Sequence, residues 1–320
     1  MEHRTIGSLS VSSIGLGCNN FGRKLDQAHS SLVVDAALDA GINFFDTADV
    51  YGYGDHPHSS TGNSERFLGA ALGSRRADVV IATKFGISMS KTDSSMRGGG
   101  RRWARQACED SLRRLGVDHI DLYQLHRPDR DSHISETLSI LDELVTEGKV
   151  RVIGCSNFTA EQLLDAMSIS SELKSVTFQS VQNEYSLLRR EVENDVLPTC
   201  TNLDIGFLPY FPLASGLLTG KYRKGQDAPP GTRLAFWEPR EHQALTDGVL
   251  DHVEEFAQLA KLSGHTILEL ALSWLLSRPQ VASVIAGATS PAQVRSNAAA
   301  ASWSLTADDL AAVDSISSRW

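Results

Sequence analysis

Eight short segments rich in strand-forming residues alternate with longer amphipathic segments along this chain. The predicted strands are nearly continuous apolar runs, which is typical of a parallel sheet covered on both faces. They span residues 12–17, 43–47, 79–84, 120–126, 150–156, 178–184, 205–210 and 283–288. Eight strand–helix alternations predict an α/β fold, a closed (β/α)8 TIM barrel.

The segments between the strands have the apolar spacing of helices. We expect helices within residues 31–41, 104–116, 134–148, 160–167 and 265–277, and the first three of these segments end in glycine, a common helix stop signal. A doubly wound sheet is the competing fold, but it would normally open with G-x-G-x-x-G after the first strand. Asn20 stands where the third glycine would be. The barrel is therefore favoured, as one domain over residues 1–320.

Charge and composition narrow the class of protein. The 30 Lys and Arg against 39 Asp and Glu give a net charge of −9, without blocks of one sign. This argues against a nucleic-acid-binding or anionic-membrane surface. No stretch approaches the roughly 20 apolar residues of a membrane span. The four cysteines lack C-x-x-C spacing and the amino terminus lacks a signal-peptide core, so we expect a cytoplasmic protein with reduced thiols.

Four chemically active side chains follow the predicted strands early in the chain. Asp46 and Lys84 end the second and third strands, His126 ends the fourth, and Tyr51 lies just beyond Asp46. Each alone has an ordinary structural explanation, such as a helix cap, a solvated strand end or a packing aromatic. Because the carboxyl ends of barrel strands meet at one face, an acid, a phenol, an ammonium and an imidazole there favour proton transfer to a carbonyl.

Seven motifs in a fixed order resemble the aldo-keto reductase family over nearly the whole chain. They are FDTADVYG, IATKFG, LYQLHRPD, GKVRVIGCSNF, VQNEYSLL, PYFPLASGLLTGKY and GATSPAQVRSN. The resemblance implies reduction of an aldehyde or ketone to an alcohol by NADPH, with a small carbonyl compound as substrate. The potassium-channel β-subunit branch of the family suggests an alternative, a nucleotide-sensing regulatory subunit with slow or no turnover.

The resemblance also implies roles for the four side chains. Tyr51 is the expected general acid in reduction and the base in the reverse direction. A free tyrosine has a pKa of about 10, and a neighbouring ammonium lowers it, so Lys84 is expected to lower the pKa of Tyr51. Asp46 would hold Lys84 charged and oriented. His126 would donate a hydrogen bond to the carbonyl oxygen, where negative charge grows as the hydride arrives.

Cofactor contacts are expected from the loops after the later strands. Small residues between Pro212 and Lys221 allow backbone N–H groups to approach a pyrophosphate, and Ser290 followed by Pro291 reads as the N-cap and first residue of a helix. By resemblance, Ser156, Asn157 and Gln182 bind the nicotinamide carboxamide and Tyr210 stacks on its ring. The full set of expected cofactor contacts is Gly17, Cys18, Asn19, Asp46, Ser156, Asn157, Gln182, Tyr210, Phe211, Pro212, Leu213, Ser215, Gly216, Leu218, Lys221, Arg233, Gly287, Thr289, Gln293 and Asn297.

The choice between NADPH and NADH depends on the adenosine end. Many relatives carry arginine at the position of Gln293 and glutamate at that of Ser296. Glutamine can hydrogen-bond a 2′-phosphate but cannot pair with its charge. We expect NADPH, with NADH left open.

No metal is expected. Two histidines lie in the turn Asp55-His56-Pro57-His58, but no third soft ligand is close in sequence, so this segment is interpreted as an exposed turn. A metal-dependent barrel hydrolase is the weakest alternative.

Residues 52–64 and 219–247 are long turn-rich excursions expected to shape substrate access. Phe21, Trp103, Phe236 and Trp237 are candidates either for an apolar substrate pocket or for core packing. The physiological carbonyl and the oligomeric state stay open.

Overall fold

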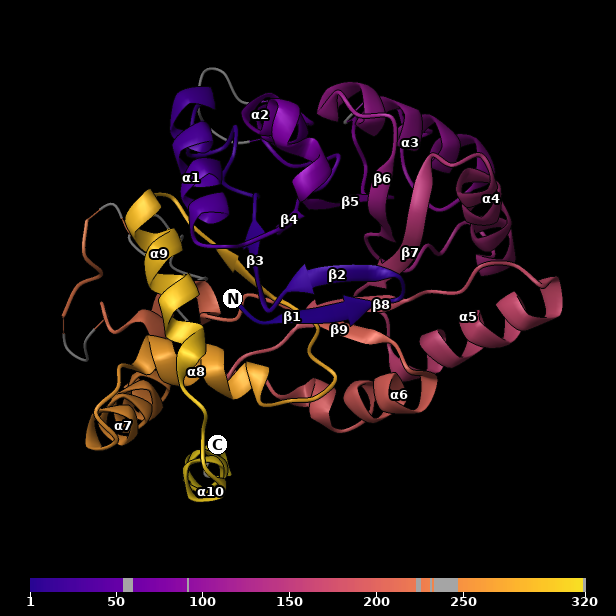
Figure 1. Ribbon diagram of the computed structural model, residues 1–320. Coiled ribbons are helices and arrows are strands. Elements are labelled where there is room, and N and C mark those ends of the chain that lie inside the picture. Colours follow the sequence, from indigo (N-terminus) through magenta and orange to yellow (C-terminus); the bar gives the residue numbers. More distant parts are fainter. Residues whose placement is uncertain (54–59, 91, 223–225, 231, 233–246, 319–320) are drawn as a thin grey trace.

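Eight parallel strands form a barrel ringed by helices (Figure 1). The structure is a computed structural model that describes residues 1–53, 60–90, 92–222, 226–230, 232 and 247–318. All eight predicted strands are confirmed, and β5 alone extends beyond its predicted range, by one residue. The barrel strands are β3 (Ile14–Gly17), β4 (Phe44–Asp46), β5 (Val80–Phe85), β6 (Ile120–Leu125), β7 (Val150–Ser156), β8 (Ser180–Glu184), β9 (Gly206–Tyr210) and β10 (Val284–Gly287).

Strand order runs β10-β3-β4-β5-β6-β7-β8-β9, and every neighbouring pair is parallel. The ring closes between β9 and the segment that leads into β10. The amide of Phe207 donates to the Gln280 carbonyl at 2.8 Å, and the amide of Ala282 donates to the Phe207 carbonyl at 2.9 Å. The predicted (β/α)8 barrel is confirmed, and the carboxyl ends of all eight strands share one face.

The predicted helices are also confirmed: α1 and α3 begin four and three residues earlier than the sequence pattern indicated, and α5 extends six residues further at its carboxyl end. Capping boxes begin α5, α8 and α10 at Thr159, Thr266 and Thr306. No helix in the described part of the chain combines the length and apolar character needed to cross a bilayer. The helices are α1 (Gln27–Asp39), α2 (Asn63–Leu72), α3 (Arg101–Leu115), α4 (Ile134–Thr146), α5 (Ala160–Leu173), α6 (Val196–Leu203), α7 (Asp247–Leu262), α8 (Ile267–Leu276), α9 (Pro291–Ala299) and α10 (Ala307–Ser317), with short 3₁₀ turns η1 (Gly73–Asp78), η2 (Glu191–Glu193), η3 (Ala214–Thr219) and η6 (Ala300–Ser302).

An antiparallel hairpin of β1 (His3–Ile6) and β2 (Leu9–Ser12) precedes the barrel. Its apolar side chains Ile6, Leu9 and Val11 join the cluster that fills the barrel interior. Arg4 adds hydrogen bonds from its guanidinium to the carbonyls of Val281 and Leu276, at 2.6 and 2.8 Å. The sequence pattern did not indicate this hairpin. Because these side chains fill the interior beside the amino-terminal strand ends, a ligand site belongs at the opposite, carboxyl-terminal face.

A second apolar layer lies between the barrel and its helices, and it includes one close backbone approach. Gly69 of α2 lies against the last turn of α3, where a β-carbon would stand only 2.0 Å from the carbonyl oxygen of Leu115. Backbone atoms on both sides leave no flexible side chain to move. Glycine is therefore required here for the contact between α2 and α3.

We predict that Gly69→Ala lowers the free energy of unfolding by about 1–3 kcal/mol, because overpacking outweighs the helix propensity gained. Gly248→Ala is the matched control: Gly248 is a helical glycine of α7 with open space around it. That control should be neutral or stabilising by up to about 1 kcal/mol. Urea unfolding of both variants measures the difference. A Gly69→Ala protein as stable as the wild type contradicts the close approach.

Candidate active site

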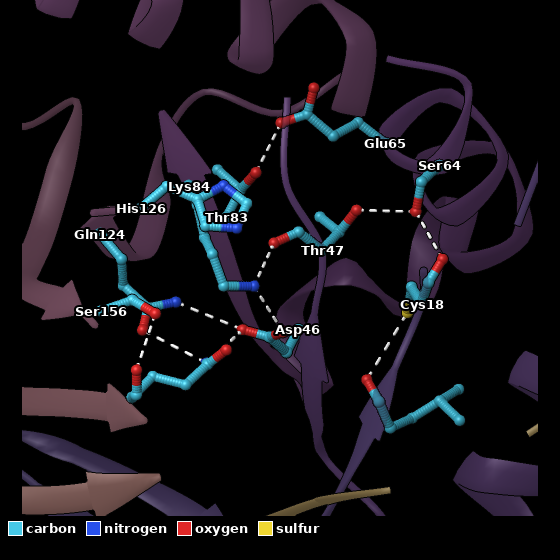
Figure 2. A network of polar contacts seen from close by, with 12 residues as sticks. Cys18, Asp46, Thr47, Ser64, Glu65, Thr83, Lys84, Gln124, His126 and Ser156 are labelled. Carbon is cyan, nitrogen blue, oxygen red and sulfur yellow. Dashed lines mark hydrogen bonds and ion pairs between the residues drawn. The ribbon is translucent and has the colours of Figure 1, made fainter. Parts of the chain in front are cut away.

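The side chains of Asp46 and Lys84 form a buried ion pair at the carboxyl end of the barrel. The Lys84 ammonium donates to Oδ2 of Asp46 at 2.6 Å and to the carbonyl of Thr47 at 2.9 Å (Figure 2). Asp46 is 3% exposed and Lys84 is 0% exposed. A buried charge is tolerated only with such compensation. Burial alone would lower the pKa of Lys84, but Asp46 and Tyr51 outweigh burial and raise it, so Lys84 stays charged.

Tyr51 lies above this ion pair in the loop after β4. Its ring centroid is 5.0 Å from the Lys84 ammonium. The loop is held in place because the carbonyl of Tyr51 accepts from the amide of Gly62, at 2.9 Å. The net pKa of Tyr51 differs from the sequence-based expectation: burial raises it, and the opposing charge of Lys84 does not reverse the direction. The phenol is therefore a protonated donor near neutral pH.

His126 follows β6 and faces Tyr51 edge-on. The two ring centroids are 5.7 Å apart and the ring planes meet at 79°. The backbone amide of His126 donates to the Phe85 carbonyl at 2.8 Å, which fixes the end of β6 against β5. Burial, together with the charges of Lys84 and Arg127, lowers the pKa of His126 well below its ordinary value. A neutral imidazole thus stands beside a neutral phenol.

Gln124 belongs to the same polar cluster, although the sequence analysis did not select it. Oδ1 of Asp46 accepts from the side-chain amides of Gln182, at 2.9 Å, and Gln124, at 3.2 Å. Gln124 is fully buried in β6. A polar residue two positions before His126 was the available signal, because residues i and i+2 of a strand share a face.

A cavity of about 820 Å³ opens above this cluster. Asp46, Tyr51 and His126 line it, whereas Lys84 lies beneath its floor. Leu218 is buried in the core and does not line the cavity, and Arg233 lies outside the described residues. The predicted cofactor contacts that do line it are Gly17, Cys18, Asn19, Asp46, Ser156, Asn157, Gln182, Tyr210, Phe211, Pro212, Leu213, Ser215, Gly216, Lys221, Gly287, Thr289, Gln293 and Asn297.

The loop after β9 has an unusual backbone where it borders the cavity. Phe211, Ala214 and Ser215 have φ angles of 52°, 44° and 58°, in the left-handed region that side chains disfavour, and Gly216 follows at 99°. Such strain concentrates at ligand sites, where the surrounding structure holds it in place. The run of small residues noted in the sequence therefore forms a tightly curved wall.

Asn157 connects three strand ends at one side of the cavity. Its side-chain amide donates to the His126 carbonyl at 2.9 Å, and its Oδ1 accepts from the Tyr210 hydroxyl at 2.8 Å. The Ser156 hydroxyl donates to the backbone carbonyl of Gln182 at 2.7 Å. These bonds hold the Tyr210 ring and the strand ends of β6, β7 and β8 in fixed relation.

The start of α9 lies at the other side of the cavity. Ser290 is its N-cap, accepting from the amide of Gln293 at 3.3 Å, and Pro291 is its first residue, as the sequence predicted. Oε1 of Gln293 accepts from the Thr289 amide at 2.8 Å. A helix amino terminus together with Lys221 suits an anionic ligand.

The chain belongs to the aldo/keto reductase family, whose model matches residues 13–318. It is 35% identical to an uncharacterised oxidoreductase, YrpG, of Bacillus subtilis (99% of this chain, 96% of the relative). It is 34% identical to a probable voltage-gated potassium channel subunit beta of Arabidopsis thaliana (93% and 90%). It is 36% identical to an NADH-specific methylglyoxal reductase of Escherichia coli (87% and 85%). Oxidoreductases and channel subunits are thus both among its relatives.

Two candidates for an apolar pocket, Phe21 and Trp103, do not line the described cavity. Phe21 is packed in the core, and Trp103 is buried between barrel and helices. Phe236, Trp237 and the turn Asp55–His58 lie outside the described residues, as does most of the 219–247 excursion. Among the described residues no group of acidic, histidine or cysteine side chains is arranged to hold a metal ion.

Asp49 is a fully buried acid close to the site, and the sequence analysis passed over it. Neither of its carboxylate oxygens has a well-aligned hydrogen-bond partner among the described residues. Burial raises its pKa well above the ordinary value, and the charge of Glu65 adds to this, while Arg114 only partly opposes it. Glu65 itself accepts from the Thr83 hydroxyl at 2.6 Å and the Arg114 guanidinium at 2.5 Å. Asp49 therefore holds its proton to a higher pH in the folded protein than in the unfolded chain.

We predict that Asp49→Asn stabilises the protein at pH 8 but hardly at pH 4. An unfolded aspartate has a pKa of about 3.9, so folding above that pH requires proton uptake by Asp49, and this cost grows until the raised folded pKa is reached. Asparagine removes that cost. Urea unfolding at both pH values measures it, with Asp165→Asn, at an exposed position of α5, as the control. An equal difference at pH 4 and pH 8 contradicts a raised pKa of Asp49 in the folded protein.

Proposed function

We propose that the protein catalyses the reversible, NADPH-dependent reduction of an aldehyde or ketone to an alcohol, with Tyr51 as the proton donor. One observation carries the proposal: a charged Lys84, paired with Asp46, lies under a phenol and a neutral imidazole at the floor of a large cavity. This arrangement provides two neutral hydrogen-bond donors for a carbonyl oxygen. It also provides a cation beside the group that loses a proton.

The chain's own residues manage the proton and the developing charge. A carbonyl oxygen placed between Tyr51 and His126 accepts a hydrogen bond from each. As negative charge grows on that oxygen, the Tyr51 proton moves to it, and the ammonium of Lys84 stabilises the phenolate that remains. Asp46 keeps Lys84 charged and fixed. The bound nicotinamide supplies the hydride.

The same cavity suits a pyridine dinucleotide. We assign the carboxamide to Ser156, Asn157 and Gln182, since Oε1 of Gln182 has no partner among the described residues while its amide is held by Asp46. The Tyr210 ring, fixed through Asn157, is the stacking surface for the nicotinamide. The strained loop between Phe211 and Gly216 takes the pyrophosphate, and Lys221 adds a positive charge.

NADPH fits the adenosine end better than NADH. Among the described residues, Asp46 contributes the one carboxylate that lines the cavity, and it pairs with Lys84, so no acid there would repel a 2′-phosphate or bind a ribose hydroxyl. Gln293 commits its Oε1 to Thr289 and keeps its amide N–H groups for a ligand. The NADH-specific relative keeps NADH as the alternative.

A nucleotide-sensing regulatory subunit is the second candidate, because relatives named as potassium-channel β subunits cover nearly the whole chain. Such a protein would bind the dinucleotide tightly yet turn over slowly. The complete set of Asp46, Tyr51, Lys84 and His126 favours the enzyme.

We place the protein in the cytoplasm, where its four buried free thiols stay reduced.

We predict that the wild type oxidises NADPH with at least one member of an aldehyde panel and that Tyr51→Phe lowers kcat by about 100-fold or more, because the proton donor is gone. NADPH affinity, measured by fluorescence titration, should stay nearly unchanged. Tyr53→Phe, an exposed position in the same loop, is the control that keeps activity. Wild-type turnover in Tyr51→Phe removes Tyr51 from its role. Tight NADPH binding by the wild type with negligible turnover across the panel supports the sensor instead.

We further predict that the wild type binds NADPH more tightly than NADH and that Gln293→Arg widens this ratio about tenfold, because a guanidinium pairs with the 2′-phosphate. NADH affinity should change little. Calorimetric titration with each nucleotide measures both constants. A wild type that prefers NADH, with a ratio unaffected by Gln293→Arg, contradicts NADPH as the cofactor.

A further inference from the structure

Arg127 is a cation at the mouth of the cavity that the proposed reaction leaves unused. It directly follows His126, is exposed, and lines the same cavity as Tyr51 and His126. It makes neither a hydrogen bond nor an ion pair within the described part of the chain. Of the other cations that line the cavity, Lys221 lies over the ring of Tyr222, 5.2 Å from its centroid, and Lys24 has contacts of its own.

The barrel order separates Arg127 from the predicted phosphate side. The strained loop after β9 and the start of α9 after β10 mark that side. In the ring order β10-β3-β4-β5-β6-β7-β8-β9, strand β6 is four places from β10 in either direction. Arg127, at the end of β6, therefore lies diametrically opposite the start of α9. Its charge serves something other than the dinucleotide phosphates.

The charge of Arg127 acts on the part of the cavity lined by His126 and Tyr210. It lowers the pKa of His126 on its own strand and opposes the rise in the pKa of Tyr210 on β9. The guanidinium is thus close to the space between these two rings. Consecutive Cα atoms are about 3.8 Å apart, so a ligand that reaches His126 is within range of a flexible arginine at the next position.

The acidic groups around Arg127 are either engaged or outside the cavity. Asp129 accepts from the amides of Gly99, at 2.7 Å, and Asp131, at 3.1 Å. Glu184, at the end of β8, influences Tyr210 but does not line the cavity. Asp46 is paired with Lys84. No carboxylate of the described chain neutralises Arg127, and a ligand anion is left as its partner.

We propose that Arg127 selects carbonyl substrates that carry an anionic group, a carboxylate or a phosphate ester, a few bonds from the reacting carbonyl. His126 and Tyr51 hold the carbonyl oxygen while the guanidinium binds the anion, preferably through two parallel N–H bonds. This inference rests on the proposed carbonyl reduction and specifies its substrate class. Neutral aldehydes remain substrates of lower efficiency, since the donors for the carbonyl do not depend on Arg127.

The test compares substrates of similar size that differ in charge. We expect kcat/KM for 4-carboxybenzaldehyde to exceed that for methyl 4-formylbenzoate by about fivefold to tenfold in the wild type, and this ratio to fall toward one in Arg127→Gln. Arg127→Lys should keep part of the preference. Arg130→Gln, an exposed arginine of the same loop that does not line the cavity, should keep all of it. Added salt should reduce the wild-type ratio. Glyceraldehyde 3-phosphate against glyceraldehyde is the corresponding comparison for a phosphate ester, and a phosphate advantage that Arg127→Gln removes supports phosphate as a ligand of Arg127.

A binding measurement separates this inference from the proposed reaction. Calorimetric titration of both benzaldehydes into the NADP⁺-containing protein reports the same acid-to-ester ratio without turnover. If no aldehyde is reduced, the proposed reaction fails. Tighter binding of 4-carboxybenzaldehyde than of its methyl ester, lost in Arg127→Gln, would still support Arg127 as the anion site. A ratio near one in the wild type, or one that Arg127→Gln leaves unchanged, overturns the inference.

Discussion

A positive charge is buried at the end of β5, and the rest of the site is arranged around it. Lys84 has no solvent contact, so its ammonium depends on Asp46 and the Thr47 carbonyl for compensation. That requirement fixes β4 against β5. It also commits one oxygen of Asp46, and the other is held by Gln124 and Gln182. A change to any of these groups would alter the charge balance under Tyr51.

Burial shifts the pKa values of Tyr51 and His126 in opposite directions, and both shifts favour the neutral ring. It raises the pKa of Tyr51 and lowers that of His126, and the lysine charge opposes the first shift and adds to the second. Both rings are therefore neutral near pH 7, and each keeps an N–H or O–H to donate. A site with one fixed cation and two neutral donors stabilises negative charge on a ligand oxygen without placing a second cation in the cavity.

The sequence alone predicted the barrel and the positions of its strands, because apolar runs separated by helical periods are a local signal. It also predicted that Asp46, Tyr51, Lys84 and His126 lie together, since strand ends meet at one face. It did not reveal Gln124, Asp49 or the net direction of the Tyr51 pKa, because these depend on three-dimensional burial and not on spacing. The burial of Leu218 was missed for a similar reason: within one curved loop, Ser215 and Gly216 line the cavity while Leu217 and Leu218 lie in the core.

The circular order of strands divides the lining of the cavity into regions of different chemistry. Strands β4 to β6 carry the groups suited to proton transfer, β7 to β9 hold the polar wall around Tyr210, and the segment after β10 presents a helix amino terminus. Asn157 joins the first two regions by bonding to both His126 and Tyr210. A flat ring held on Tyr210 thereby has a fixed distance to His126, which follows β6. Because the backbone ladder of a closed barrel sets the separations between strand ends, strand register fixes where the loops that carry Tyr51 and Asn157 begin.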